Sequence, residues 1–414
     1  MRRARIISIG TELVLGQCVD TNAAWLSEQL AGQGVRCERH VTVADDPIAI
    51  RDVLREAAGA CDLIVATGGL GPTADDLTRE ALAEAADTEL EVDAASVEQI
   101  RAYFTRRGRE MPERNQVQAR IPRTGRAVEN TCGTAPGIWV ELRGTPCYAL
   151  PGVPFEMKAM FARDVLAGVR VAAAGAVLRC RRLHCIGMHE AGIGDQLRDL
   201  MAPDRNPHVG TSAEAGVIDV QISARGDSTE EAESLLDKTD SEVCARLGKV
   251  VYGRDRDTLA SVVGTDLAAS GQTLSTAESC TGGLIAKLLT DVPGSSAYYV
   301  GGAVTYADRL KERVLGVPAE TLASMGAVSE LTVRAMAQGA QEAFSTTFAL
   351  AVTGIAGPGG GTSDKPVGLV FFGLATPTGC RVREMRLGTD APRAMIRARA
   401  ARIALDFVRL RGER

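Results

Sequence analysis

The sequence predicts an α/β protein in which two large domains flank a small α+β module. Short apolar runs alternate with segments of helical periodicity in the N-terminal third, and the same alternation returns after residue 258. A chain of 414 residues is long enough for two or three domains, and its 45% hydrophobic content supplies their cores. We place the domains at residues 1–170, 171–253 and 254–414.

The N-terminal third is expected to form a doubly wound parallel sheet. Its expected strands are residues 5–10, 35–44 and 62–67, and its expected helices are residues 22–31 and 47–59. Strands that alternate with helices are typical of parallel sheets, in which ligands bind beyond the carboxyl ends of the strands.

Polar and glycine-rich segments follow each of these strands. They are Gly10-Thr11-Glu12 with Asp20-Thr21-Asn22, then Asp45-Asp46, then the segment from Thr67 to Asp76. Glycines expose backbone N–H groups to phosphate, and carboxylates could hold a hard cation that bridges phosphates. The last segment is neither a Walker A loop nor GxGxxG. The alternative is that Asp75 or Asp76 caps a helix that starts near Leu77.

The middle of the chain predicts a small α+β module. Strands are expected at residues 180–187 and 217–223, and helices at residues 190–201 and 228–247, the second with a serine cap. The preceding run, Val165–Val177, is either a helix that ends the first domain or a linker.

In the C-terminal third, Ser279 falls on a strand-to-helix turn. The expected strands are residues 272–275, 299–304, 347–352 and 367–375, and the expected helices are residues 284–289 and 391–409. Free backbone N–H groups at a helix N-terminus attract developing negative charge, so Ser279 is a candidate nucleophile with an oxyanion hole. The alternative is that Ser279 or Thr281 only caps the helix.

A base for Ser279 must come from a residue other than histidine. The chain has four histidines and none lies after residue 208, so this domain cannot supply a Ser-His-Asp triad. Lys311 with Tyr306 as a relay would form a Ser–Lys arrangement. An ordinary lysine has a pKa of about 10.4, so a lysine base needs burial or neighbouring arginines to lower it. The alternative is a solvated helix residue.

Several long motifs of this domain resemble the C-terminal domain of the CinA family. They are Thr276–Gly283, Val304-Thr305-Tyr306 with Lys311, Gly326–Ser329, and Thr353–Gly361 with Lys365–Gly368. That domain, where active, is a nicotinamide mononucleotide deamidase. The resemblance implies that Ser279 is the nucleophile and that Tyr306 and Lys311 activate it. The substrate-binding candidates are Cys280, Thr281, Gly282, Gly283, Thr353, Gly354, Gly357 and Arg397.

Arg397 is a candidate for the nucleotide 5′-phosphate. Arg393 and Arg397 lie four residues apart on one face of the last expected helix, where both could bind phosphate. A solvated basic face is the alternative, and the resemblance favours the phosphate role for Arg397.

The N-terminal domain resembles the molybdenum-cofactor-biosynthesis domain in the form that begins CinA proteins. Asn130–Gly137 and Leu150–Met157 add to this match. The resemblance implies a metal-dependent ADP-ribose pyrophosphatase, with Mg, Mn or Co held by Asp45 and Asp76. The nucleotide-binding candidates are Thr11, Glu12, Asn22, Gly68, Gly69, Gly71, Thr73 and Thr134. The middle module resembles a KH-type domain without a basic GxxG loop, so it predicts a spacer or dimerisation role rather than RNA binding.

Composition narrows the possible partners. The net charge is −5 and aromatic residues are few, which argues against nucleic acid. No apolar run reaches the length of a membrane span or of a signal-peptide core. The ten scattered cysteines are expected to be free thiols. We therefore expect a cytoplasmic homodimer that acts on small nucleotides.

The leading prediction is hydrolysis of nicotinamide mononucleotide to nicotinate mononucleotide and ammonia, without a metal or other cofactor. A second prediction adds metal-dependent cleavage of ADP-ribose by the first domain. The alternative from another class is a non-catalytic nucleotide- or molybdopterin-binding regulator linked to competence.

Overall fold

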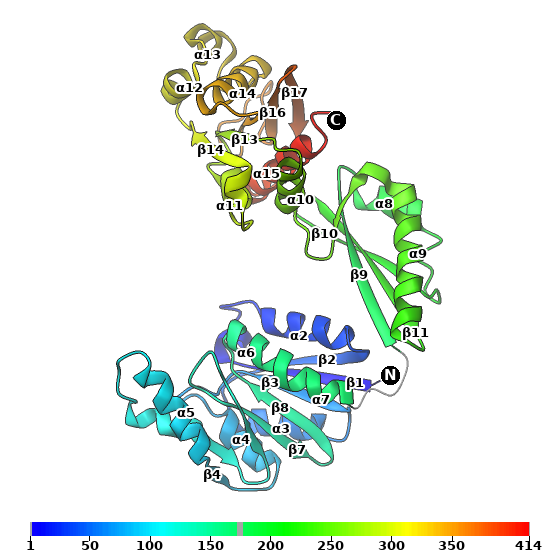
Figure 1. Cartoon of the computed structure of the whole chain (residues 1–414), viewed down its shortest axis with the longest axis vertical. Helices are drawn as coiled ribbons and strands as arrows, with labels where there is room; N and C mark the ends of the chain where they lie inside the picture. The colour runs from blue at the N-terminus through cyan, green and yellow to red at the C-terminus, as the bar shows by residue number, and fades with distance from the viewer. Residues whose placement is uncertain (1, 172–176, 414) are drawn as a thin grey trace. The chain divides into compact units, whose positions relative to one another are not determined.

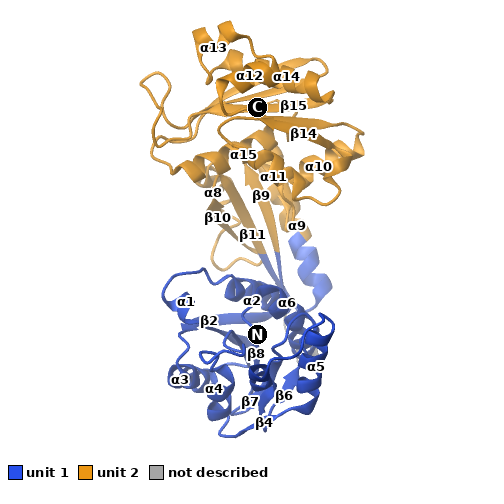
Figure 2. Ribbon diagram, turned by 90° about the vertical axis from the view of Figure 1, so that its left-hand side faces the viewer, with its two compact units in different colours: residues 1–180, 223–236 blue, residues 181–222, 237–414 orange. Residues whose placement is uncertain are grey.

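The computed structural model describes residues 2–171 and 177–413 (Figure 1). These residues group into two compact units, 1–180 with 223–236 and 181–222 with 237–414, which Figure 2 shows in different colours. Both units are mixed α/β structures, as predicted. The described part of the chain contains no helix with the length and apolar character that crossing a membrane requires.

The first unit is built on a six-stranded sheet of order β2-β1-β3-β8-β7-β6. Its strands are β1 (Arg2–Ile9), β2 (Val35–Val43), β3 (Leu63–Thr67), β6 (Arg126–Val128), β7 (Gly137–Leu142) and β8 (Thr145–Leu150). Strands β2, β1, β3 and β8 are parallel, and β7 and β6 extend the sheet in antiparallel fashion. The parallel part confirms the predicted fold class, and β4 (Leu90–Val92) pairs with β5 (Arg120–Pro122) in a separate ribbon.

Helices cover both faces of this sheet. One apolar core packs α3 (Pro47–Ala57) and α4 (Thr78–Ala85) against it, and a second core packs α2 (Thr21–Ala31) and α6 (Pro154–Met160) on the other face (Figure 1). The remaining elements are α1 (Thr11–Val14), α5 (Ala94–Thr105) and η1 (Glu113–Ala119), and, after α6, a π-helical turn η2 (Phe161–Val165) and α7 (Leu166–Val171). A helix thus occupies the start of the predicted run Val165–Val177, while residues 172–176 of that run lie outside the described residues.

The middle segment forms a four-stranded sheet of order β10-β11-β9-β12 with residues in both units. Its elements are β9 (Val177–Ile186), α8 (Glu190–Leu197), β10 (His208–Glu214), β11 (Val217–Gly226), α9 (Thr229–Leu247), η3 (Gly248–Val250) and β12 (Val251–Arg254). Both expected strands and both expected helices form, and the Ser228 hydroxyl accepts the Glu231 N–H at the start of α9. Strands β10 and β12 were not predicted from the sequence.

The C-terminal sheet has the order β14-β13-β15-β16-β17. Its strands are β13 (Leu274–Glu278), β14 (Tyr299–Val304), β15 (Phe348–Gly354), β16 (Leu369–Thr376) and β17 (Gly379–Arg386). Strand β13 is parallel to both β14 and β15, and β16 and β17 are antiparallel additions. The strand expected at residues 272–275 therefore begins and ends later, so that Ser279 follows its last residue directly.

Two helical layers enclose the C-terminal sheet. The core on one face contains α10 (Leu259–Ala269), α11 (Leu284–Thr290) and α15 (Arg393–Arg409), and the core on the other contains α14 (Glu330–Phe344). The remaining elements are η4 (Ser295–Ala297), α12 (Asp308–Leu315) and α13 (Ala319–Met325). All ten cysteines are free thiols, as expected.

Candidate active sites

Parallel pairing brings the C-terminal motifs to one edge of their sheet. In register, Glu278 at the end of β13 lies beside Val304 of β14 and Val352 of β15. The residues that follow these three strands therefore meet at the same edge, where α/β sheets bind ligands. A cavity of about 260 Å³ opens there, lined by Ser279, Tyr306 and Lys311, which the sequence placed together.

Ser279 begins a tight turn whose conformation depends on glycine. The Gly282 N–H donates to the Ser279 carbonyl at 3.1 Å, and the Ser279 N–H donates to the Val352 carbonyl at 3.0 Å. Gly282 and Gly283 have φ values of 62° and 91°, a region that favours glycine. Ser279 is 8% exposed and lines the cavity, so its position is fixed while it stays accessible to a small ligand.

The buried Glu278 carboxylate occupies most of the N–H groups at the start of α11. It accepts the N–H of Gly283 at 2.9 Å, of Ile285 at 3.2 Å and of Ala286 at 2.8 Å. The Ser or Thr cap that the sequence left as an alternative is absent, because the preceding strand supplies the capping carboxylate. Free N–H groups therefore remain only in the turn that precedes α11.

The turn after Ser279 contains the remaining candidates for an oxyanion hole. The Gly282 N–H is already bound to the Ser279 carbonyl. The N–H groups of Cys280 and Thr281 make no hydrogen bond within the described residues. Of these two residues, Cys280 lines the cavity, and an unpaired backbone N–H next to a nucleophile is a usual donor to an oxyanion.

Lys311 is a buried lysine rather than a solvated one. It is 1% exposed, and its Nζ donates to the carbonyls of Thr305 at 3.0 Å and Tyr306 at 3.3 Å and to Asp308 Oδ1 at 3.2 Å. These three acceptors match the three N–H bonds of an ammonium group. Lys311 thereby anchors the turn that carries Tyr306.

Tyr306 is 58% exposed, and its hydroxyl accepts a hydrogen bond from Arg393 at 2.7 Å. Within the described residues, no hydrogen bond joins the Ser279 hydroxyl to Tyr306 or Lys311. The three side chains thus share a cavity without forming a connected relay in this structure. Catalytic hydrogen bonds are often completed only when substrate binds.

The two arginines of α15 have different positions. Arg393 lines the cavity and donates to the Gly357 carbonyl at 2.6 Å as well as to Tyr306. Arg397 does not line it; its guanidinium donates to the Thr281 carbonyl at 2.7 Å behind the Ser279 turn. Arg393 thus borders the cavity, and Arg397, one helical turn further along α15, contacts the backbone of the turn that follows Ser279.

The other substrate-binding candidates divide in the same way. Cys280, Thr353, Gly354 and Gly357 line the cavity, whereas Thr281, Gly282 and Gly283 lie in the turn behind it. Burial raises the pKa of the Cys280 thiol to about 12, which excludes a thiolate nucleophile beside Ser279. Asp308, Ala327 and Val328 also line this cavity but were not among the candidates, although Ala327 and Val328 belong to the Gly326–Ser329 motif.

In the first unit, the carboxyl ends of β2, β1, β3 and β8 surround a cavity of about 450 Å³. The sequence-predicted residues that line it are Glu12, Asp45, Gly68, Gly69, Gly71, Asp76 and Thr134. Glu156 and Gln118 line it too and were missed, because they come from α6 and η1, far along the chain.

Two glycines of this cavity are required by the fold itself. A Cβ on Gly68 would lie 2.0 Å from the Ile9 carbonyl oxygen, and one on Gly69 would lie 2.2 Å from the Thr78 hydroxyl. Both have positive φ, of 109° and 64°. Close approach of β3 to β1 and α4 thus explains these glycines without a ligand.

Asp76 closes the loop that follows β3. Its carboxylate accepts the N–H groups of Gly71 at 2.8 Å and Thr73 at 2.9 Å, and the Thr73 hydroxyl at 2.5 Å. Neither Asp75 nor Asp76 caps α4, whose N-cap is Leu77 without a side-chain bond, so that alternative was wrong. The buried Arg79 supports the loop from below through the carbonyls of Leu70 at 2.8 Å and Gly71 at 2.7 Å.

Three nucleotide-binding candidates of the first unit do not line its cavity. Thr11 donates its N–H and hydroxyl to Asp45 Oδ2, at 2.8 and 2.9 Å. Asn22 donates to the Gly152 carbonyl at 2.8 Å, and Thr73 is bound to Asp76. In this structure Thr11 and Asn22 link different strands and loops, and Thr73 links two parts of one loop.

The donor set suits a divalent cation only in part. Asp45 keeps Oδ1 available, while Asp76 uses both oxygens within its loop. Across residues 2–171 and 177–413, no group of three His, Cys, Asp or Glu could hold a metal. The carboxylates therefore fit a cation whose remaining ligands are phosphate oxygens and water, as is usual for Mg²⁺.

Three family models match successive parts of the chain. Residues 5–167 match a probable molybdopterin binding domain, residues 180–253 the KH domain of damage-inducible protein CinA, and residues 256–411 the CinA C-terminal domain. CinA-like proteins from Parasynechococcus marenigrum and a Synechococcus strain are 42% and 41% identical, and each alignment covers 98% of this chain and 97% of the relative. The chain belongs to the CinA family.

Solved structures of CinA proteins match single domains of the chain. The competence/damage inducible protein CihA from Agrobacterium tumefaciens is 48% identical over 37% of this chain and 92% of its own, with a TM-score of 0.36. The three family models that match successive parts of the chain, together with the full-length relatives, confirm the family that the motifs indicated.

Proposed function

We propose that this CinA protein hydrolyses the amide of nicotinamide mononucleotide, giving nicotinate mononucleotide and ammonia. The observation that carries the proposal is the cavity that Ser279, Tyr306 and Lys311 line together with Cys280, whose backbone N–H has no hydrogen-bond partner within the described residues. A hydroxyl nucleophile, a proton acceptor and an oxyanion hole are the parts that amide hydrolysis requires.

In the proposed reaction, the Ser279 hydroxyl attacks the carboxamide carbon and the N–H group of Cys280 stabilises the oxyanion. Lys311, through Tyr306, takes the serine proton and returns it to the departing ammonia. Water then hydrolyses the acyl-enzyme. To act in this way, Lys311 must give up one proton and with it one of its three present acceptors.

Two residues hold the nucleophile without touching substrate. The Glu278 carboxylate fixes the start of α11 through three N–H groups, and Arg397 holds the carbonyl of Thr281. Arg393, which lines the cavity and has the planar fork that matches phosphate, would bind the 5′-phosphate.

A second activity, cleavage of the ADP-ribose pyrophosphate, is proposed for the cavity of the first unit. The observation that favours it is the shared lining of glycine-rich loop and carboxylates, with Asp45 Oδ1 available for a cation. A divalent cation bound there would neutralise charge on the pyrophosphate. Asp45 would bind it directly, and Asp76 would shape the loop that receives the phosphates.

The proposed amidase is tested with Ser279→Ala. We expect ammonia release from nicotinamide mononucleotide to fall to the uncatalysed level while circular dichroism and thermal unfolding stay unchanged. The matched control is Ser324→Ala, since Ser324 is exposed and bonds only to the Glu320 carbonyl. Retention of activity by the Ser279 variant would refute the proposed nucleophile.

A further inference from the structure

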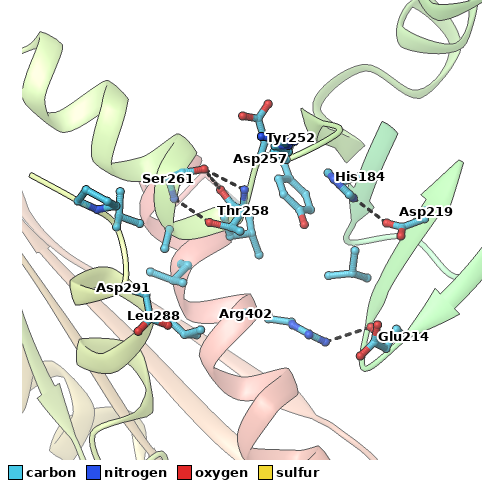
Figure 3. A pocket seen from close by; sticks show the side chains of 17 residues that line it. His184, Glu214, Asp219, Tyr252, Asp257, Thr258, Ser261, Leu288, Asp291 and Arg402 are labelled. Atoms are coloured by element: carbon cyan, nitrogen blue, oxygen red, sulfur yellow. Dashed lines mark hydrogen bonds and ion pairs between the residues drawn. The ribbon is translucent and has the colours of Figure 1, made fainter. Parts of the chain in front are cut away.

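A third cavity, of about 470 Å³, lies within the second unit, where β9, β11 and β12 meet α10 and α15. His184 of β9 forms one side of it, with Asp219 and Tyr252 next to it and the start of α10 at Thr258 opposite (Figure 3). His184 is 8% exposed, belongs to neither site described above and carries a network of its own.

Both ring nitrogens of His184 face acceptor atoms. Nδ1 lies 2.7 Å from Asp219 Oδ1, and Nε2 lies 3.0 Å from the Asp255 carbonyl oxygen. A carboxylate and a carbonyl can only accept, so both nitrogens must carry a proton. The geometry thus requires the imidazolium form of His184, and only this form makes both contacts.

The surrounding groups agree with this protonation state. The hydrogen bond to Asp219 raises the pKa of His184, and the Asp255 carbonyl raises it further, while burial and the nearby Arg182 act in the opposite direction. Tyr252 stacks on the imidazole with ring centroids 5.6 Å apart, and burial raises the pKa of its hydroxyl to about 12, so it stays neutral.

The carbonyl that His184 holds belongs to the connection between β12 and α10. Asp255 has a φ of 51° in this connection, and its N–H donates to the Arg182 carbonyl at 2.8 Å. Two residues further on, Asp257 accepts the Arg254 N–H at 2.8 Å, and Thr258 then caps α10. The connection is therefore tied to β9 in part through His184.

We propose that the His184 imidazolium holds the β12–α10 connection against β9 and β11 in a pH-dependent manner. Loss of one proton breaks the contact between His184 and the Asp255 carbonyl and thereby loosens the connection. The remaining proton stays on Nδ1, where the Asp219 carboxylate binds it most strongly. Nε2 then presents a lone pair to the Asp255 carbonyl, and the contact becomes repulsive. The first helix of the C-terminal domain is thereby loosened from the middle module.

The other charged groups around the cavity do not account for a change of this contact between pH 5 and 8. Arg402 of α15 binds the carbonyls of Glu214 and Ala215, and Asp291 of α11 is paired with Lys287. Arg256 lies in the connection itself, and the Arg182 Nε lies 3.8 Å from Asp219 Oδ2. Of these residue types, only histidine normally titrates between pH 5 and 8.

The direction of the effect follows from the raised pKa. A histidine whose folded-state pKa exceeds its unfolded value stabilises the fold fully below the unfolded value. That contribution disappears as the pH rises through the folded-state pKa of His184. The connection should therefore be tight in mildly acidic solution and open above neutrality.

The test is ¹⁵N NMR of the histidine rings in the full-length protein, together with hydrogen exchange of residues 253–258 as a function of pH. We expect both His184 nitrogens to be protonated at low and neutral pH and Nε2 to lose its proton at higher pH. Over the same range, exchange of these amides, corrected for its intrinsic pH dependence, should rise about tenfold, equivalent to about 1.4 kcal/mol.

Variants distinguish loss of the His184 contact from general unfolding of the protein. His184→Gln should show fast exchange at residues 253–258 at every pH, and Asp219→Asn should move the transition to lower pH. His208→Gln, in an exposed position of the same unit, should leave the profile unchanged. The proposal is overturned if wild-type His184 carries a single proton at pH 6, or if its titration leaves exchange at residues 253–258 unaltered.

Discussion

The cavities of the first unit and of the C-terminal sheet have the same origin but use their polar side chains differently. Both form where parallel strands end. In the first, Asp76 uses both carboxylate oxygens within its own loop, and Asp45 binds Thr11 through Oδ2 and keeps Oδ1 available. In the second, Ser279 and Lys311 are buried and held by their surroundings. The first site therefore leaves a carboxylate oxygen open for the proposed cation, whereas the serine and lysine of the second are preassembled.

Replacing Lys311 by arginine changes the preassembled site directly and should have the largest effect on amidase activity. Arginine keeps the positive charge but does not give up its proton in proteins, so amidase activity should nearly vanish. Lys287→Arg is the control, because Lys287 is exposed and pairs only with Asp291. Steady-state ammonia release is the measurement. If Lys311→Arg keeps most of its activity, the lysine only anchors the turn and Tyr306 is the base.

Metal removal should distinguish the activities proposed for the two cavities. We expect a chelator to stop ADP-ribose cleavage and to leave ammonia release unchanged, because the proposed amide hydrolysis uses Ser279, Tyr306 and Lys311, whereas the proposed pyrophosphate cleavage uses a cation bound by Asp45. Calorimetry in the presence of a non-hydrolysable ADP-ribose analogue should show that Mn²⁺ binds less tightly to the Asp45→Asn variant than to the wild-type protein. Loss of ammonia release on chelation would contradict the comparison, as would unchanged Mn²⁺ binding in the variant.

The two arginines of α15 sharpen the distinction between a ligand-binding residue and a supporting one. Arg393→Gln removes a cavity-lining guanidinium and should raise KM for nicotinamide mononucleotide about tenfold. Arg397→Gln releases the Thr281 carbonyl and should lower kcat by about the same factor with little change in KM. A raised KM in Arg397→Gln and a lowered kcat in Arg393→Gln would instead support Arg397 as the phosphate-binding residue.

The smallest predicted effect concerns Asp308, whose carboxylate accepts a hydrogen bond from Lys311. Its Oδ1 lies 3.2 Å from Nζ, but the carboxylate is 59% exposed, so solvent screens the pair. Asp308→Asn keeps a side-chain oxygen that can accept from Nζ, so kcat/KM for ammonia release should fall by no more than about threefold. A much larger loss would show that the charge of Asp308 is itself needed for the reaction.

Local sequence determined most of the elements and the edges at which the sites form. Short apolar runs predicted strands at residues 272–275, 299–304 and 347–352, which the structure places at 274–278, 299–304 and 348–354, since such runs depend only on neighbours along the chain. The motifs around Ser279 and Lys311, read together with the absence of a nearby histidine, indicated residues that share one cavity. The family was likewise readable from the motifs alone.

Only the tertiary structure decided what each polar group does. The capping of α11 by Glu278, the place of Arg397 behind the cavity and the use of Asp76 within its own loop all depend on distances between backbone amides and side chains. The contact of His184 with Asp255 joins residues 71 positions apart. Sequence periodicity records which face of an element is buried, but a hydrogen-bond partner is fixed only when separate elements pack.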